Sequence, residues 1–177
     1  MKLAFAAIAM ATSLSFVAYA SAAIPSIDVG FSPEGSAEQL VLRTLDDAHE
    51  SIRLMGYSFT SPEVVKSLVE AKRRGVDVRV VVGEKGNRSK ASQAAMNVVV
   101  NAGIPLRTND QYKIMHDKVI IADGRNIEVG SFNYTRAADR VNSENVLVVW
   151  DDPVVAQRYL QHWLTRWSQG TDWKRAY

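Results

Sequence analysis

The sequence predicts an α/β fold, in which one domain contains a mixed, mostly parallel sheet flanked by helices on both faces. Runs rich in β-branched residues alternate with segments whose apolar residues recur at helical spacing, which is the order typical of βαβ units. Two of the strands are separated only by the turn signal Asp123-Gly124, which predicts an antiparallel hairpin within the sheet. The chain contains no internal repeat or linker, so a single domain is expected over residues 23–177.

The first half of the chain is predicted to contain three helices and two strands. Residues 32–34 read Ser-Pro-Glu, a capping side chain followed by proline and an early carboxylate, so a helix is expected from there to residue 49. Residues 52–59 and 76–82 are strongly β-branched and predict strands. A second helix begins at residues 61–63, again Ser-Pro-Glu, and a third covers 89–101.

The second half is predicted to contain the hairpin and a long final helix. Residues 104–108 are short and extended, 115–122 and 125–130 form the two hairpin strands, and 145–150 form another buried strand. Asp152-Pro153 begins the C-terminal helix. At helical spacing, Trp163 and Trp167 are more typical of a core than of base stacking.

The hairpin carries the residues with the clearest chemistry. His116, Lys118, Asp123, Ser131 and Asn133 form the pattern H-x-K-x4-D-x6-G-S-x-N. An imidazole can attack phosphorus, while an ammonium with amide or hydroxyl donors can hold the phosphate oxygens as charge builds. These residue types are suited to phosphoryl chemistry without a metal.

Strand geometry predicts that these groups converge. Alternate side chains of a strand share a face, so His116 and Lys118 are expected to point together and Asp117 to point the opposite way. The returning strand would carry Ser131 and Asn133 back to the level of His116. Each residue alone would more simply be a core or solvent-facing residue, and the joint pattern is what favours a site.

Three further features have both a functional and a structural interpretation. Glu144 precedes a core strand and is expected to orient the imidazole of His116, or else to be a solvated carboxylate. Asp123 is expected to accept hydrogen bonds at the hairpin turn, or simply to begin it. The basic loop, residues 83–90, follows a predicted parallel strand and either holds flanking phosphates or is solvated. His49 and His162 have no partner motif and are assigned no role.

With every specified position matched, the pattern resembles the HKD motif of the phospholipase D superfamily. The short chain with one motif is similar to the small secreted bacterial endonucleases of that superfamily. The resemblance implies a phospholipase D-like domain, catalytic roles for the motif residues and no cofactor. Larger members supply a second proton-active group from a second motif, so one motif per chain implies a homodimer with a shared active site.

The N-terminus has the pattern of a secretion signal. A lysine at position 2, an apolar run and two A-x-A sites ending at Ala20 and Ala22 predict a cleaved segment 1–22, rather than a membrane anchor. A periplasmic or secreted protein without an anchor after cleavage is therefore expected. The net charge of +2 is too small to indicate nucleic-acid binding by itself, and zero cysteines exclude thiolate metal sites.

The resulting functional prediction is a metal-independent endonuclease of low specificity that cleaves DNA, with RNA as an alternative substrate, through a phosphohistidine. A phospholipase or phosphatidyl transferase of the same superfamily would be expected to have an apolar groove or an interfacial segment beside the site, and the sequence indicates neither. A non-catalytic nucleic-acid-binding module is the third interpretation, against which the intact His116, Lys118 and Asn133 argue.

Overall fold

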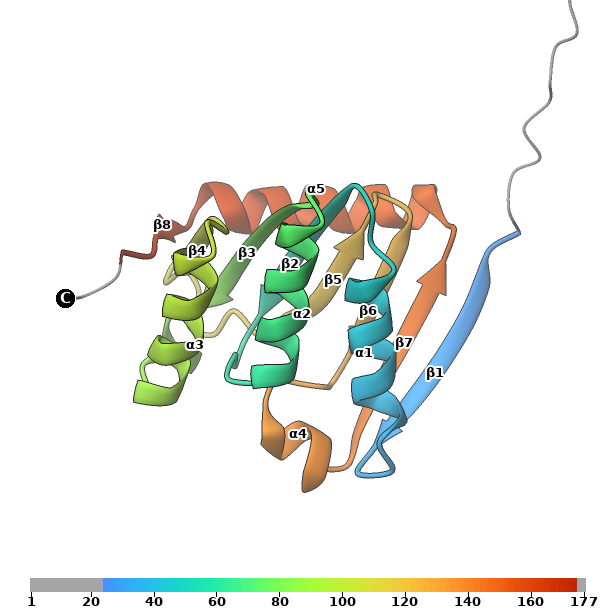
Figure 1. Cartoon of the computed structure of the whole chain (residues 1–177), viewed down its shortest axis with the longest axis horizontal. Coiled ribbons are helices and arrows are strands. Elements are labelled where there is room, and N and C mark those ends of the chain that lie inside the picture. The colour runs from blue at the N-terminus through green and yellow to red at the C-terminus, as the bar shows by residue number, and fades with distance from the viewer. Residues whose placement is uncertain (1–23, 175–177) are drawn as a thin grey trace, which may run out of the picture.

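The computed structural model describes residues 24–174, and the predicted signal segment lies outside them. Its elements in chain order are β1 (Ser26–Ser32), α1 (Ser36–Asp46), β2 (Ser51–Gly56), α2 (Pro62–Arg73), β3 (Asp77–Gly83), the 3₁₀ turn η1 (Lys85–Asn87), α3 (Lys90–Asn101), β4 (Leu106–Asn109), β5 (Lys118–Ala122), β6 (Asn126–Gly130), α4 (Arg136–Arg140), β7 (Glu144–Trp150), α5 (Pro153–Ser168) and β8 (Thr171–Asp172). The strands form one mixed sheet in the order β1-β7-β6-β5-β2-β3-β4-β8. Helices α1, α2 and α3 cover one face and α5 covers the other, which confirms the predicted class (Figure 1).

Parallel pairing is less common than the sequence predicted. Among the described strands, β2–β3 and β3–β4 are parallel, whereas the other five pairings are antiparallel. The reason is that the strand–helix alternation ends at β4. After it, β5, β6 and β7 follow one another with only a turn or the short α4 between them, and such connections favour antiparallel neighbours. The predicted hairpin is present as β5 and β6.

The first element of the sheet was not predicted. Ser32 ends strand β1, where it is level with Glu144 of β7, so the helix expected from this serine begins at Ser36 instead. Residues 26–32 alternate in side-chain direction along an edge strand, and four of the seven stay exposed. An edge strand that leaves apolar residues in solvent gives a weaker sequence signal than a buried one.

The predicted caps of α2 and α5 and the predicted apolar core are present. Ser61 accepts a hydrogen bond from Val64 N at 3.2 Å, and Asp152 accepts one from Val155 N at 2.9 Å, which fixes the starts of α2 and α5. One apolar core lies between the sheet and α1–α3, and a smaller one lies between the sheet and α5. Trp163 is fully buried in the second core and donates to Leu54 O at 3.0 Å, as its helical spacing indicated.

Candidate active site

The motif residues gather at one end of the sheet. Lys118 begins β5 and is level with Gly56, where β2 ends. Ser131 directly follows β6, Asn133 lies two residues further on, and Glu144 begins β7. The ladders place these positions at the end of the sheet where the parallel strands β2 and β3 finish. Open α/β sheets bind ligands outside such strand ends.

His116 lies just outside the strand in which the sequence placed it. Strand β5 begins at Lys118 because the neighbouring strand β2 ends at Gly56, and beyond that pair no backbone continues the ladder. The predicted alternation still holds. His116 and Lys118 both approach the ring of Tyr57, whereas Asp117 turns to the opposite face and meets His162 of α5. The exposed His116 imidazole is accessible to a substrate.

Lys118 is a buried ammonium beside that exposed imidazole. Its side chain is only 4% exposed, and Nζ donates to the backbone oxygen of His116 at 2.9 Å. Burial lowers the pKa of Lys118 below its usual value, and the negative charges of Glu144 and Asp117 partly offset that effect. A partly desolvated cation of this kind interacts more strongly with phosphate oxygens than a solvated one does.

Tyr57 is a close neighbour of both His116 and Lys118 that the sequence did not indicate. Its ring centroid lies 4.9 Å from that of His116, with the two planes tilted by 53°. Lys118 Nζ lies 5.5 Å from the same centroid. The contact joins the segment just after β2 to the segment at the start of β5 and depends on the register of these two strands, so the local sequence contains no sign of it.

Glu144 was expected to contact His116, and Ser131 to contact a phosphate. In the structure these two side chains contact each other instead. Ser131 Oγ donates to Glu144 Oε2 at 2.5 Å, and Asn142 Nδ2 donates to Glu144 Oε1 at 3.0 Å. No hydrogen bond joins Glu144 to His116 within residues 24–174, so the predicted contact with the imidazole is absent there. Ser131 Oγ also accepts from Asn145 N at 3.1 Å. This hydroxyl therefore holds Glu144 in place, and Glu144 acts on Lys118 through its charge.

Asp123 does not belong with the catalytic residues. It follows the last residue of β5, and at roughly 3.3 Å per strand residue it is about 16 Å along the strand from Lys118. Its carboxylate accepts from the backbone N–H groups of His49 at 2.9 Å, Glu50 at 2.7 Å and Ser51 at 2.8 Å. Asp123 is therefore the acceptor that fastens the hairpin turn to the start of β2, which is the hydrogen-bonding role that the sequence predicted for it.

A buried carboxyl group lies on β6, the strand that precedes the loop carrying Asn133. Glu128 is fully buried, and Tyr134 Oη donates to its Oε2 at 2.9 Å. Burial raises the pKa of Glu128 to about 8, and the hydrogen bond from Tyr134 opposes this only in part. Glu128 is therefore protonated at neutral pH. The pair ties the residue that follows Asn133 to the centre of the sheet.

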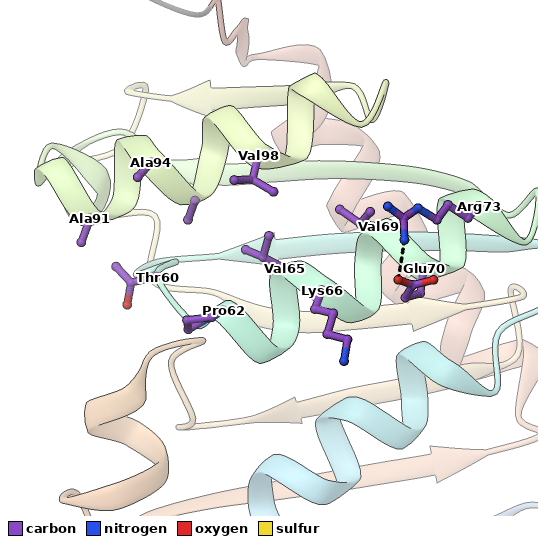
Figure 2. Close-up of a pocket in the computed structure, with 11 residues that line it drawn as sticks. Thr60, Pro62, Val65, Lys66, Val69, Glu70, Arg73, Ala91, Ala94 and Val98 are labelled. Carbon is purple, nitrogen blue, oxygen red and sulfur yellow. Dashed lines mark hydrogen bonds and ion pairs between the residues drawn. The ribbon is translucent and has the colours of Figure 1, made fainter.

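An apolar cleft lies away from the motif, between α2 and α3. It has a volume of about 500 Å³, and Val65 and Val69 of α2 face Val98 of α3 across it (Figure 2). Its end at Thr60 touches the candidate site, because Thr60 N donates to Tyr134 O at 2.8 Å. The sequence did not predict this apolar groove.

Within residues 24–174, no group of three or more histidine, aspartate or glutamate side chains is arranged to hold a metal ion. Over the same residues, no helix combines the length and the apolar character needed to span a bilayer.

The fold and the motif geometry together define a phospholipase D-like domain, and the chain belongs to that family. Residues 41–167 match the family described as cardiolipin synthase, PLD-like domain. The crystal structure of Nuc from Salmonella typhimurium, a phospholipase D family member, is similar to this chain, with 55% sequence identity and a TM-score of 0.85. The match covers 86% of this chain and 100% of Nuc.

Two relatives have names that refer to lipid substrates. A phospholipase D of Rickettsia conorii is 34% identical over 136 residues, which are 77% of this chain and 66% of that protein. A mitochondrial cardiolipin hydrolase of Xenopus laevis is 30% identical over 156 residues, which are 88% of this chain and 70% of that protein. The chain thus spans about two thirds of the length of these relatives.

Proposed function

We propose that the protein is a phosphodiesterase that needs no metal, and specifically an endonuclease of low specificity acting on DNA, with RNA as an alternative substrate. The observation that carries this proposal is the pairing of an exposed imidazole, His116, with the buried ammonium of Lys118 at the end of the sheet. The similarity to Nuc over that protein's whole length supports a nuclease within the family.

The reaction would proceed in two displacements. One imidazole nitrogen of His116 attacks phosphorus, an N–P bond forms, and the P–O bond to the leaving nucleotide breaks as that oxygen takes a proton. Water then attacks phosphorus, gives up a proton and releases the imidazole. Lys118 and the amide of Asn133 stabilise the phosphate oxygens, while Ser131 contributes indirectly by holding Glu144.

The proton for the leaving oxygen would come from a second His116 in a homodimer. An apolar row on β1 supports such an assembly: Ile27, Val29 and Phe31 are 63%, 58% and 52% exposed on one face of the edge strand. Ile27 is level with Val149, which packs toward α5, so this face is the α5 face of the sheet. Phe31 is level with Asn145, at the end of the sheet where the catalytic residues lie.

A phospholipase is the second candidate, and the apolar cleft between α2 and α3 favours it. The cleft reaches the site at Thr60, and the Rickettsia and Xenopus relatives are named for lipid hydrolysis. A phospholipid bound at His116 could place part of an acyl chain there. The non-catalytic alternative, a nucleic-acid-binding module, would retain the phosphate site without turnover.

One experiment separates the three. The mature protein, for which we propose a periplasmic or secreted location on the signal pattern, is incubated with plasmid DNA and, separately, with phosphatidylcholine–cardiolipin vesicles, each in excess EDTA. DNA nicking that survives chelation and is absent in His116→Ala supports the nuclease. Turnover of lipid alone would move the assignment to phospholipase. Binding of DNA without turnover of either substrate would mean that the module is non-catalytic.

A further inference from the structure

We propose that Tyr57 is a positioning residue for catalysis, and that the turn at residues 83–87 holds its ring against His116 and Lys118. This inference rests on the proposed phosphodiesterase reaction, and it assigns a role to the basic loop that the sequence analysis left open. Three features of the structure support this role: the contacts of the Tyr57 ring, the groups that hold it, and the small amount of space around it.

The ring contacts both motif residues at once. A centroid separation of 4.9 Å and a tilt of 53° between Tyr57 and His116 lie within the range of favourable aromatic pairs. Lys118 Nζ, at 5.5 Å from the Tyr57 centroid, is within the range of a cation–π contact. One flat surface therefore limits how the nucleophile can rotate and where the ammonium can lie.

Asn87 fixes the backbone that carries this ring. Its Nδ2 donates to Tyr57 O at 2.6 Å and to Gly83 O at 2.8 Å, while its Oδ1 accepts from Phe59 N at 2.9 Å. Asn87 is only 3% exposed, so these three bonds are shielded from water. The side chain thus fastens residues 57–59, which follow β2, to the turn that follows β3.

Gly86 leaves no room for Tyr57 to move toward the turn. A Cβ atom at Gly86 would come within 2.3 Å of Tyr57 O and within 2.9 Å of two atoms of the ring. The backbone of Gly86 lies outside the left-handed region, so alanine would be compatible with its conformation. The glycine is needed here because the tyrosine packs directly against it.

Two of the three cations of the basic loop are engaged within the loop and its surroundings. Arg88 Nη2 lies 2.8 Å from Glu84 Oε2, and Lys85 Nζ donates to Lys113 O at 3.1 Å. The loop therefore acts on the site through Asn87, Gly86 and the tyrosine that they hold. This assignment differs from the flanking-phosphate role considered from the sequence.

The ring, and not the hydroxyl, carries the proposed role. The Tyr57 hydroxyl has no hydrogen-bond partner in the part of the chain that the structure describes, whereas the ring makes both contacts. Tyr57→Phe should therefore behave as the wild type, and Tyr57→Leu should not. Loss of the ring leaves His116 free to rotate, and misplacement of a reacting group by about 1 Å costs roughly 100-fold in rate.

The test uses four full-length proteins: the wild type, Tyr57→Phe, Tyr57→Leu and Gly86→Ala. Cleavage of a fluorescent oligonucleotide gives kcat and KM, and the rate of carbethoxylation at each histidine, read by peptide mass spectrometry, reports access to His116. We expect kcat to fall roughly 10- to 100-fold in Tyr57→Leu and Gly86→Ala, with KM little changed. Tyr57→Phe should retain the wild-type kcat. His116 should be modified several-fold faster in the two impaired variants, while His49, which lies beside Asp123 at the other end of β5, provides an internal reference.

The outcomes separate this inference from the proposed function. If wild-type protein cleaves no phosphodiester, the proposed function fails, and the modification rates alone still test whether Tyr57 covers His116. If the wild type turns over while Tyr57→Leu keeps its kcat and its His116 modification rate, the positioning role is wrong and the function stands. A fall in Tyr57→Phe equal to that in Tyr57→Leu would assign the effect to the hydroxyl and overturn the inference. Gly86→Ala provides the second variant should Tyr57→Leu fail to fold.

Discussion

His162 Nε2 lies 3.0 Å from Asp117 Oδ1, and this pair fastens the H-x-K segment to helix α5. Asp117 stands between His116 and Lys118 in the chain, and these two neighbours contact Tyr57 while Asp117 contacts α5. The H-x-K segment is therefore held by two separate contacts, one at Tyr57 and one at α5. His162, to which the sequence analysis assigned no role, acquires one from a contact between residues 45 positions apart.

The first prediction concerns this pair. His162→Ala and Asp117→Ala should each lower kcat by about 10-fold, because either change frees the backbone on both sides of His116. The double variant should be little worse than the single ones, with a coupling energy of roughly 0.5–3 kcal/mol, since both remove the same contact. Steady-state kinetics of the wild type, the two single variants and the double variant completes this double-mutant cycle. Fully additive losses would show that the two residues act separately.

The second prediction concerns the groups proposed to touch phosphate. His116→Ala should abolish turnover with the fold intact, because the side chain is exposed and lies outside the β5 ladder. Lys118→Ala and Asn133→Ala should each lower kcat by roughly 10²–10³, the scale for loss of one preorganised donor. Circular dichroism of each variant is the control. A His116→Ala protein that is free of host nuclease and keeps near wild-type rates would contradict the mechanism.

The third prediction is a pH shift in Glu144→Gln. The carboxylate of Glu144 favours the charged form of Lys118, so its removal should lower the pKa of Lys118 further. Activity that needs protonated Lys118 is lost as pH rises through that pKa. The alkaline limb of the pH–rate profile should therefore move to lower pH in the variant, while Glu70→Gln, near the C-terminal end of α2, should leave it in place. An unmoved alkaline limb would remove Glu144 from the electrostatics of the site.

Sequence reasoning located the site and missed what supports it. The placement of His116, Lys118 and Asn133 at one end of the sheet was predictable because a hairpin has a fixed period of two and a short turn. The same geometry put Asp123 at the hairpin turn, where it accepts hydrogen bonds as expected, and the five residues of β5 separate it from that end of the sheet. Tyr57 and Asn87 were not predictable, because their contacts depend on the register of β2 beside β3 and β5. Strand β1 was missed because its apolar side chains remain exposed.

The fourth prediction concerns stability and the buried Glu128. Its pKa is about 8 in the folded protein, above the usual value of 4.5 that applies when the chain is unfolded. Between these values the folded state binds one proton more than the unfolded state, so stability falls as pH rises, by about 1.4 kcal/mol per pH unit at most. Glu128→Gln keeps an acceptor for Tyr134 but cannot ionise. Urea unfolding should show the variant gaining on the wild type from pH 5 to pH 8, whereas a constant difference would contradict a protonated Glu128.

The fifth prediction is that the active unit is a dimer with one shared site. Each chain carries one HKD motif, and the proposed cycle needs two histidines, one to attack and one to protonate the leaving oxygen. The apolar row of Ile27, Val29 and Phe31 is the proposed dimer contact, and it can be tested directly by mutation. Val29→Lys should shift the protein to monomer in analytical ultracentrifugation and should lower activity in parallel, because a buried lysine opposes association.

Subunit mixing then tests whether the site is shared. Wild-type and His116→Ala chains are combined in known ratios and left until subunit exchange is complete. A heterodimer has one nucleophile but no second imidazole for the leaving group, so it should be nearly inactive. Activity per total protein should therefore fall with the square of the wild-type fraction, as two-fold symmetry requires when both subunits complete one site. A linear decline would mean that each chain holds a complete site, and the dimer would then serve some purpose other than catalysis.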